Sequence, residues 1–194
     1  MKKTGLFILC MMSLVLTSCS TSTVAATPTE PSGTIRKVEG QTLILSHPEF
    51  YWTLTLPQDW VISHDTGFEI EANNVGETAF MHLLSQTWLT KDRKPNTRAY
   101  VDYWKNSTYG DIFPIFAEGT LVSETEVRPD KFGGPYLRYE FDDSKKGIHY
   151  LQIYGSSGGP NSLAVTAWAK NTDYPNVQAV LEAVLNSVEL LPEK

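Results

Sequence analysis

Cysteine is scarce in this sequence, and both copies, Cys10 and Cys19, lie close to the N-terminus. The chain beyond Cys19 therefore has no disulfide, thiolate nucleophile or thiolate metal ligand available to it. An excess of positive charge is also absent, because 22 acidic side chains outnumber 16 lysines and arginines. This balance argues against nucleic acid as a partner, since phosphate backbones are bound by basic surfaces. With hydrophobic residues at 41% and aromatic residues at 11%, the composition is that of a globular protein and not of a disordered one.

The N-terminus has the features of an export signal. Lys2 and Lys3 form a positively charged start, and the apolar run from Leu6 to Leu16 is too short to span a bilayer. Leu16-Thr17-Ser18-Cys19 closes this run and resembles the bacterial lipoprotein signal. The resemblance implies a diacylglyceryl group on the Cys19 thiol and a further acyl chain on its amine. Two or three chains anchor durably, because each buried methylene contributes about 0.8 kcal/mol.

The alternative interpretation is an ordinary secretory signal in which Cys19 happens to lie near the cut. Under the lipoprotein interpretation, residues 1–18 are the signal peptide and Cys19 is the lipidated first residue. Ser20 follows it, and the usual sorting rule of bacterial lipoproteins would not retain such a protein in the inner membrane. We therefore expect an extracytoplasmic protein anchored to the cell membrane by lipid, in the outer membrane if the organism has two.

The chain after the signal divides into a tether and a domain. Residues 20–33 are mainly serine, threonine, alanine and proline with one charge, so they cannot bury enough apolar surface to fold. We expect residues 19–33 to form the lipidated cysteine and a flexible tether. Residues 34–194 show no internal repeat or second linker, and their length suits a single domain.

Apolar and polar residues alternate through most of this domain, which predicts short strands separated by turns. The predicted strands are residues 42–46, 51–56, 60–63, 68–72, 78–88, 121–127, 136–141, 148–154 and 163–170. Short loops join the last three, so these should form an antiparallel meander.

Two helices are predicted among these strands. Asn96 can cap a helix that runs to about Lys105, and Pro175 suits the first turn of a C-terminal helix. The C-terminal helix has one apolar stripe: Val177, Val180, Leu181, Val184, Leu185 and Val188. The predicted fold is α+β, an antiparallel sheet of about six to seven strands flanked by helices on both faces, in an α/β/α sandwich.

The order of these elements resembles the PsbP/Mog1-like superfamily. The resemblance rests on Leu-Pro-x-x-Trp at 56–60, a mid-chain helix, the meander through 138–141, 150–153 and 164–167, and a final helix closing at 186–190. It implies an antiparallel sheet flanked by helices. The superfamily includes extrinsic photosystem proteins, a nuclear GTPase-binding protein and many bacterial lipoproteins of unknown role. Its members are mostly non-enzymatic adaptors, so the resemblance implies a non-catalytic protein.

Catalytic motifs are absent from the sequence. None of the four histidines has His-x-His or His-Glu-x-x-His spacing. Residues 155–159 only resemble the Gly-x-Ser-x-Gly elbow, and they fall in a predicted hairpin instead of a strand-to-helix turn. The sequence therefore predicts no enzyme, no catalytic residue and no cofactor.

One acidic pair has a second interpretation as a cation site. Glu69 and Glu71 are two apart on a predicted strand and share a face, with His64 and Asp65 across a short turn. Such a group could hold a divalent cation. A solvated acidic edge strand is the simpler interpretation, so no metal is expected.

Two segments around the middle helix offer interaction surfaces. The basic cluster Lys91, Arg93, Lys94 and Arg98 is either simply solvated or touches anionic lipid or an acidic partner. The segment from Tyr109 to Phe116 is rich in large apolar residues, and it either closes over the sheet or exposes a patch. The candidate interaction surface is Trp104, Tyr109, Ile112, Phe113 and Phe116.

The sequence favours a non-catalytic binding or accessory module for an envelope protein complex, anchored to the membrane. The alternative is a carrier of a small apolar ligand, in which the middle helix and the aromatic segment cap a cavity on the sheet. An enzyme ranks third.

Overall fold

The computed structural model describes residues 33–87, 98, 101–102, 119–127, 136–156 and 161–191. The predicted signal peptide, Cys19 and the tether up to residue 32 lie outside these residues. The predicted interaction surface at residues 104–116 also lies outside them and stays a prediction. Within the described residues, no helix has the length and apolar character needed to cross a membrane.

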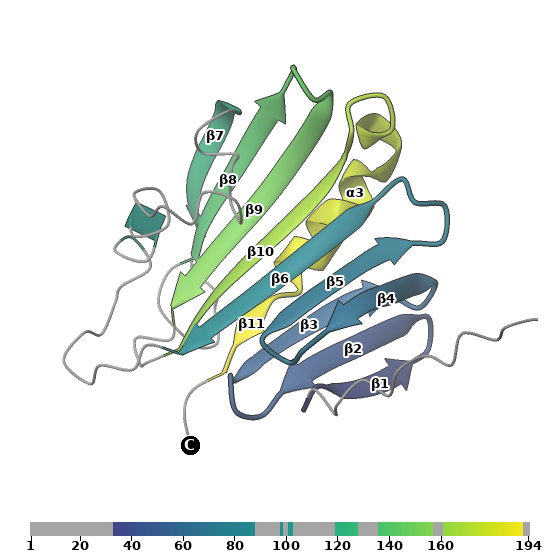
Figure 1. The fold of residues 1–194 in the computed structure, drawn as a ribbon, viewed down its shortest axis with the longest axis vertical. Coiled ribbons are helices and arrows are strands. Elements are labelled where there is room, and N and C mark those ends of the chain that lie inside the picture. The colour runs from purple at the N-terminus through teal and green to yellow at the C-terminus, as the bar shows by residue number, and fades with distance from the viewer. Residues whose placement is uncertain are drawn as a thin grey trace, which may run out of the picture.

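The strands of the described residues form two antiparallel sheets (Figure 1). The small sheet has the order β1 (Ile35–Glu39), β2 (Thr42–His47), β3 (Trp52–Pro57) and β11 (Glu189–Leu190). The large sheet has the order β4 (Trp60–Asp65), β5 (Glu69–Asn74), β6 (Phe80–Thr87), β10 (Asn161–Lys170), β9 (Ile148–Ser156), β8 (Tyr136–Asp143) and β7 (Thr120–Val127). Helix α3 (Tyr174–Asn186) follows β10, with Pro175 in its first turn as predicted.

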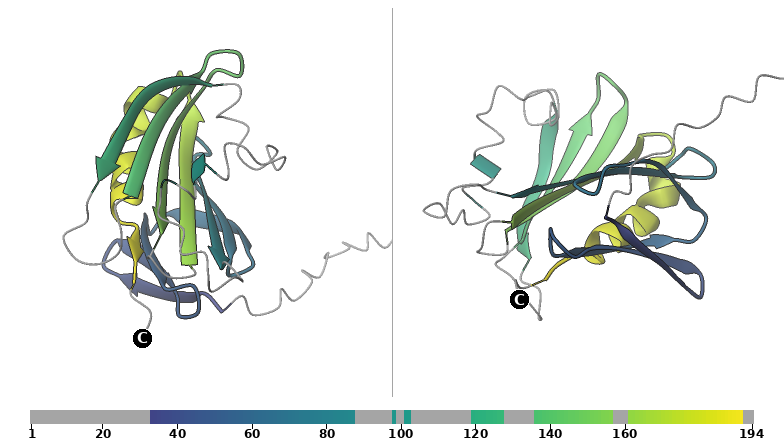
Figure 2. Two further views of the ribbon diagram at one scale, coloured as in Figure 1. Left: turned by 90° about the vertical axis from the view of Figure 1, so that its left-hand side faces the viewer. Right: turned by 60° about the horizontal axis from the view of Figure 1, so that its bottom comes forward.

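The predicted single sheet with helices on both faces, an α/β/α sandwich, is wrong. The strands divide between two sheets, and the small sheet and α3 both pack against the same face of the large sheet (Figure 2). The alternation at residues 42–46 and 51–56 correctly predicted two strands, β2 and β3. These strands pair with each other and with β1 and β11, in a sheet separate from the predicted meander. Pairing depends on contacts between distant segments, which local periodicity does not encode.

The main hydrophobic core lies between the two sheets and α3. The inward side chains of β3 are fully buried there, as the alternation predicted: Trp52, Leu54 and Leu56. Helix α3 adds Leu181, Val184 and Leu185 from the predicted stripe. Val180, also in that stripe, is 37% exposed and lies at the margin of the contact.

The face of the large sheet opposite α3, here called the outer face, carries a second apolar cluster. Strands β8 and β9 contribute Leu137, Tyr139, Phe141 and Tyr154. Val101, which is fully buried, packs against them. It belongs to the predicted middle helix, of which residues 98, 101 and 102 are described and are helical. The other described half of the outer face, over β5 and β6, is more polar.

Candidate functional site

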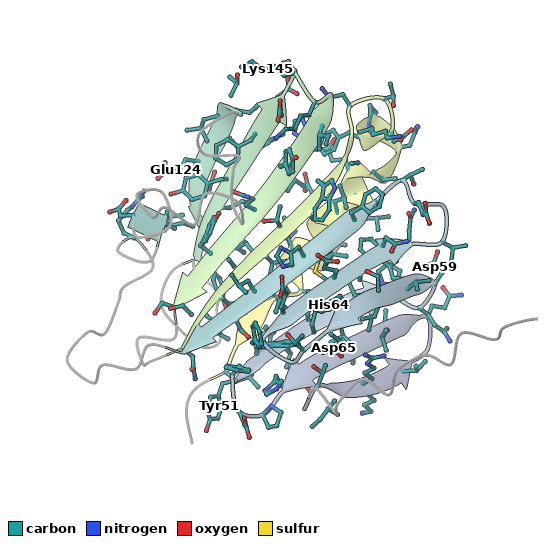
Figure 3. All side chains as sticks on the ribbon, in the orientation of Figure 1. Tyr51, Asp59, His64, Asp65, Glu124 and Lys145 are labelled. Carbon is teal, nitrogen blue, oxygen red and sulfur yellow. The ribbon has the colours of Figure 1, made fainter. Side chains whose placement is uncertain are left out.

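A row of polar side chains crosses the outer face from one edge of the large sheet to the other. Residues paired in register on neighbouring antiparallel strands lie side by side on the same face. From β4 to β7, the register aligns His64, Glu71, His82, Thr166, Gln152, Tyr139 and Glu124. Figure 3 shows His64 and Glu124 toward opposite edges of the sheet. We call these seven residues the polar row.

Four titratable side chains converge at the β4 end of the polar row. Glu69 precedes Glu71 by two residues on β5 and therefore shares its face. The Glu69 carboxylate lies between two imidazoles, with Oε1 2.9 Å from Nε2 of His82 and Oε2 3.8 Å from Nε2 of His64. Ligand atoms of Glu69, Glu71 and His82 all lie within 4.8 Å of one another. We call these four residues the His–Glu cluster.

The middle of the polar row is a buried hydrogen-bond network. The Gln152 side-chain Nε2 donates to Oγ1 of Thr166 at 3.2 Å. The Tyr154 hydroxyl donates to Oε1 of Gln152 at 3.1 Å. Gln152 and Thr166 are buried, so these hydrogen bonds provide partners for polar side-chain atoms that are shielded from water. The network fixes the buried centre of the outer face, and the His–Glu cluster beside it is more accessible than this centre.

The β7 end of the row is held by Arg98. Its guanidinium donates to Oε1 of Glu124 at 2.5 Å and to the Tyr139 hydroxyl at 3.2 Å. The hydrogen bond to Glu124 raises the pKa of Arg98, and burial followed by the Glu124 charge raises the pKa of Tyr139 to about 12. Of the predicted basic cluster, Arg98 is the residue that the structure describes. Its hydrogen bonds to Glu124 and Tyr139 connect the middle segment to the large sheet.

An aromatic row lies beside the polar row on the same face. The register aligns Phe80, Trp168, Tyr150 and Phe141 across β6, β10, β9 and β8. The Phe80 and Trp168 rings are stacked with centroids 5.6 Å apart, and Trp168 and Tyr150 follow at 6.4 Å. Phe80, Trp168 and Tyr150 are only partly buried. The outer face therefore presents aromatic and polar side chains in parallel rows.

A separate His–Glu pair lies on the α3 side of the large sheet. His149 Nε2 is 2.8 Å from Oε1 of Glu140, and the imidazole stacks on the ring of Tyr174 with centroids 3.8 Å apart. Burial, followed by the Glu140 charge, raises the pKa of Tyr174 to about 12. This pair joins β8 and β9 to the start of α3, and we interpret it as structural.

The structure unites only part of the predicted cation group. Glu69, Glu71 and His64 do come together, but Asp65 is buried and turned away, where it accepts hydrogen bonds from Arg36 at 2.6 Å and Thr34 at 2.8 Å. His82 was missed, because only the pairing of β5 with β6 places it opposite Glu71. Strand β5 is also not at an edge, since it lies between β4 and β6.

The stability of the domain should fall as the pH rises from about 10 to 12. Tyr139 and Tyr174 have pKa values raised to about 12 in the folded protein, against about 10 in the unfolded chain. In this window the folded state holds more protons than the unfolded state, so raising the pH favours unfolding. Urea midpoints measured at about pH 9.5 and 11.5 should differ less in the Tyr139→Phe/Tyr174→Phe variant than in the wild type. An equal loss in both proteins would contradict this assignment.

Together these features define a β-protein of two antiparallel sheets with a helix on one face and a polar, aromatic surface on the other. No family model and no curated protein sequence matches this chain. Among solved structures, the solution structure of cyanobacterial PsbP (CyanoP) from Synechocystis sp. PCC 6803 superposes with a TM-score of 0.53 and 10% identity, covering 86% of this chain and 97% of that one. A crystal structure from Bacteroides thetaiotaomicron gives a TM-score of 0.38 at 14% identity, covering 80% and 50%. The first comparison confirms a PsbP-like fold.

Proposed function

We propose that this protein is a non-catalytic accessory module, held at the extracytoplasmic face of a bacterial membrane by lipid on Cys19 and bound there to an envelope protein complex. The observation that carries the proposal is the PsbP-like fold, shared over 86% of the chain. The superfamily that the sequence resembles consists mostly of adaptors. The lipoprotein-like sequence Leu16-Thr17-Ser18-Cys19 supports the membrane attachment.

The outer face offers the chemistry that such a module needs to bind a protein. Phe80, Trp168 and Tyr150 present partly exposed aromatic surface, which is enriched in protein interfaces.

We further propose that Trp104, Tyr109, Ile112, Phe113 and Phe116 form the partner-binding surface, as expected from the sequence. Deleting residues 109–116 should abolish the partner contact while the domain keeps its far-UV circular dichroism spectrum; retention of the partner would contradict this surface.

Replacing Cys19 with alanine should release the protein from the membrane, because the acylated sulfur is the proposed anchor. The measurement is fractionation of cells that express the full-length protein with a C-terminal tag. Cys10→Ala is the matched control, since it removes the other cysteine from within the predicted signal and should leave the protein in the membrane fraction. Retention of Cys19→Ala in the membrane at the wild-type level would contradict lipid anchoring.

Gentle solubilisation of the same membranes tests the accessory role. We expect a stoichiometric protein partner to co-purify with the wild type and to be lost with Cys19→Ala. Recovery of the wild-type protein alone would contradict the accessory role.

A further inference from the structure

We infer that the His–Glu cluster of His64, Glu69, Glu71 and His82 is a binding site for a divalent transition-metal ion of the zinc type. The inference does not depend on the accessory role, because it rests on the arrangement of these four side chains on the outer face. It goes beyond the sequence, which favoured a solvated acidic strand and did not include His82.

The strands hold three of the donors side by side. His64 is paired in register with Glu71, and Glu71 is paired with His82. These three residues therefore occupy neighbouring positions on β4, β5 and β6. Behind them, Ile70, Ala72 and Met81 are buried in the main core. A register slip of one residue would turn these apolar side chains to solvent. The core therefore fixes the side on which the donors lie.

The spacing of the donor atoms suits one small cation. A tetrahedral zinc ion with ligands at about 2.0–2.1 Å holds them about 3.3 Å apart. The two contacts of the Glu69 carboxylate bracket this separation, at 2.9 Å to His82 and 3.8 Å to His64. Donor atoms of Glu69, Glu71 and His82 all lie within 4.8 Å of one another, and His64, outside this group of three, approaches it through its contact with Glu69.

The donor types select the class of metal. Two imidazole nitrogens with carboxylate oxygens form a set that zinc and neighbouring transition metals accept, whereas calcium and magnesium prefer oxygen alone. Exposure of the side chains allows a metal ion to enter, since His64 is 47% exposed and Glu69 32% exposed. His82, at 16%, forms the inner wall of the site.

His149 provides a matched comparison within the same molecule. It also lies close to a glutamate, with 2.8 Å between its Nε2 and Oε1 of Glu140, but its ring is stacked on Tyr174 and the glutamate beside it, unlike Glu69, is not part of a three-donor group within 4.8 Å among the described residues. A histidine–glutamate pair alone should not bind the metal as the four-residue cluster does.

The test is zinc titration of the full-length protein, purified in detergent with a tag that contains no histidine and stripped with a chelator. We expect one saturable Zn²⁺ site per chain with a dissociation constant in the micromolar range or tighter, and no competition from equal Mg²⁺ or Ca²⁺. His82→Gln and His64→Gln should each raise the dissociation constant at least about tenfold, while His149→Gln leaves it unchanged. Zinc X-ray absorption should show imidazole nitrogen at about 2.0 Å.

Two outcomes would overturn the site. One is the absence of saturable binding by the wild type, and the other is an equal loss of affinity in His64→Gln and His149→Gln. His64→Gln is the decisive variant if His82→Gln fails to fold, because His64 is half-exposed and its replacement leaves the core intact.

Discussion

Alanine in place of Gly155 should lower the free energy of unfolding by about 3 kcal/mol or more. A Cβ atom at this position would lie 2.2 Å from Cε1 and 2.3 Å from Cδ1 of Tyr136, and 2.9 Å from Cδ1 of Leu190. The Tyr136 ring is buried at 2% exposure and cannot move aside freely. Its hydroxyl accepts a hydrogen bond of 2.7 Å from the backbone N–H of Leu190. Relief of the clash must therefore break this bond or shift the strand.

Urea denaturation followed by circular dichroism measures this effect, and two variants calibrate it. Gly76→Ala is the matched control, because the nearest atoms to a Cβ at Gly76 are 3.9 Å away. It should change stability by less than about 1 kcal/mol. In a Tyr136→Ala background, Gly155→Ala should add little further loss, because the clashing ring is gone. A Gly155→Ala protein as stable as Gly76→Ala would show that Tyr136 does not confine this strand.

The contact between Tyr136 and Leu190 also explains why the fold was only partly predictable. The meander of β8, β9 and β10 and the helix α3 follow from local periodicity, and the structure confirms both. The segment after α3 was expected to close the helix, yet residues 189–190 form β11 against β3. Its partners, Trp52, Thr53 and Tyr136, are distant in sequence, and no local pattern signals such a pairing.

The His–Glu cluster divides in the same way. Glu69 and Glu71 share a face because strand residues alternate, and this part could be predicted from spacing. His82 enters the cluster through the register of β5 with β6, which depends on how the whole sheet assembles. A β-bulge between Ile62 and His64 sets the position of His64 on β4, and nothing in the local residue pattern marks it. The sequence therefore predicted His64, which a short turn brings beside β5, and missed His82, which only the register of β5 with β6 brings there.

Trp52 should tolerate phenylalanine far better than alanine, although it is among the largest fully buried side chains. Trp52→Ala removes an aromatic ring from the contact between the two sheets, and it should cost about 3–5 kcal/mol. Trp52 also pairs with His47 on β2 and with Leu190 on β11, so the cavity would loosen both neighbours in the small sheet.

The smaller cost of Trp52→Phe follows from the indole nitrogen. Nε1 of Trp52 is buried and has no hydrogen-bond partner among the described residues, and a buried unsatisfied donor costs about 1–3 kcal/mol. Phenylalanine removes this donor while it keeps much of the ring volume, so the two effects offset and the net loss should stay within about 1.5 kcal/mol. Urea denaturation of both variants separates the contributions. A Trp52→Phe protein as unstable as Trp52→Ala would mean that the shape of the indole, and not its apolar volume, holds the small sheet against the large one.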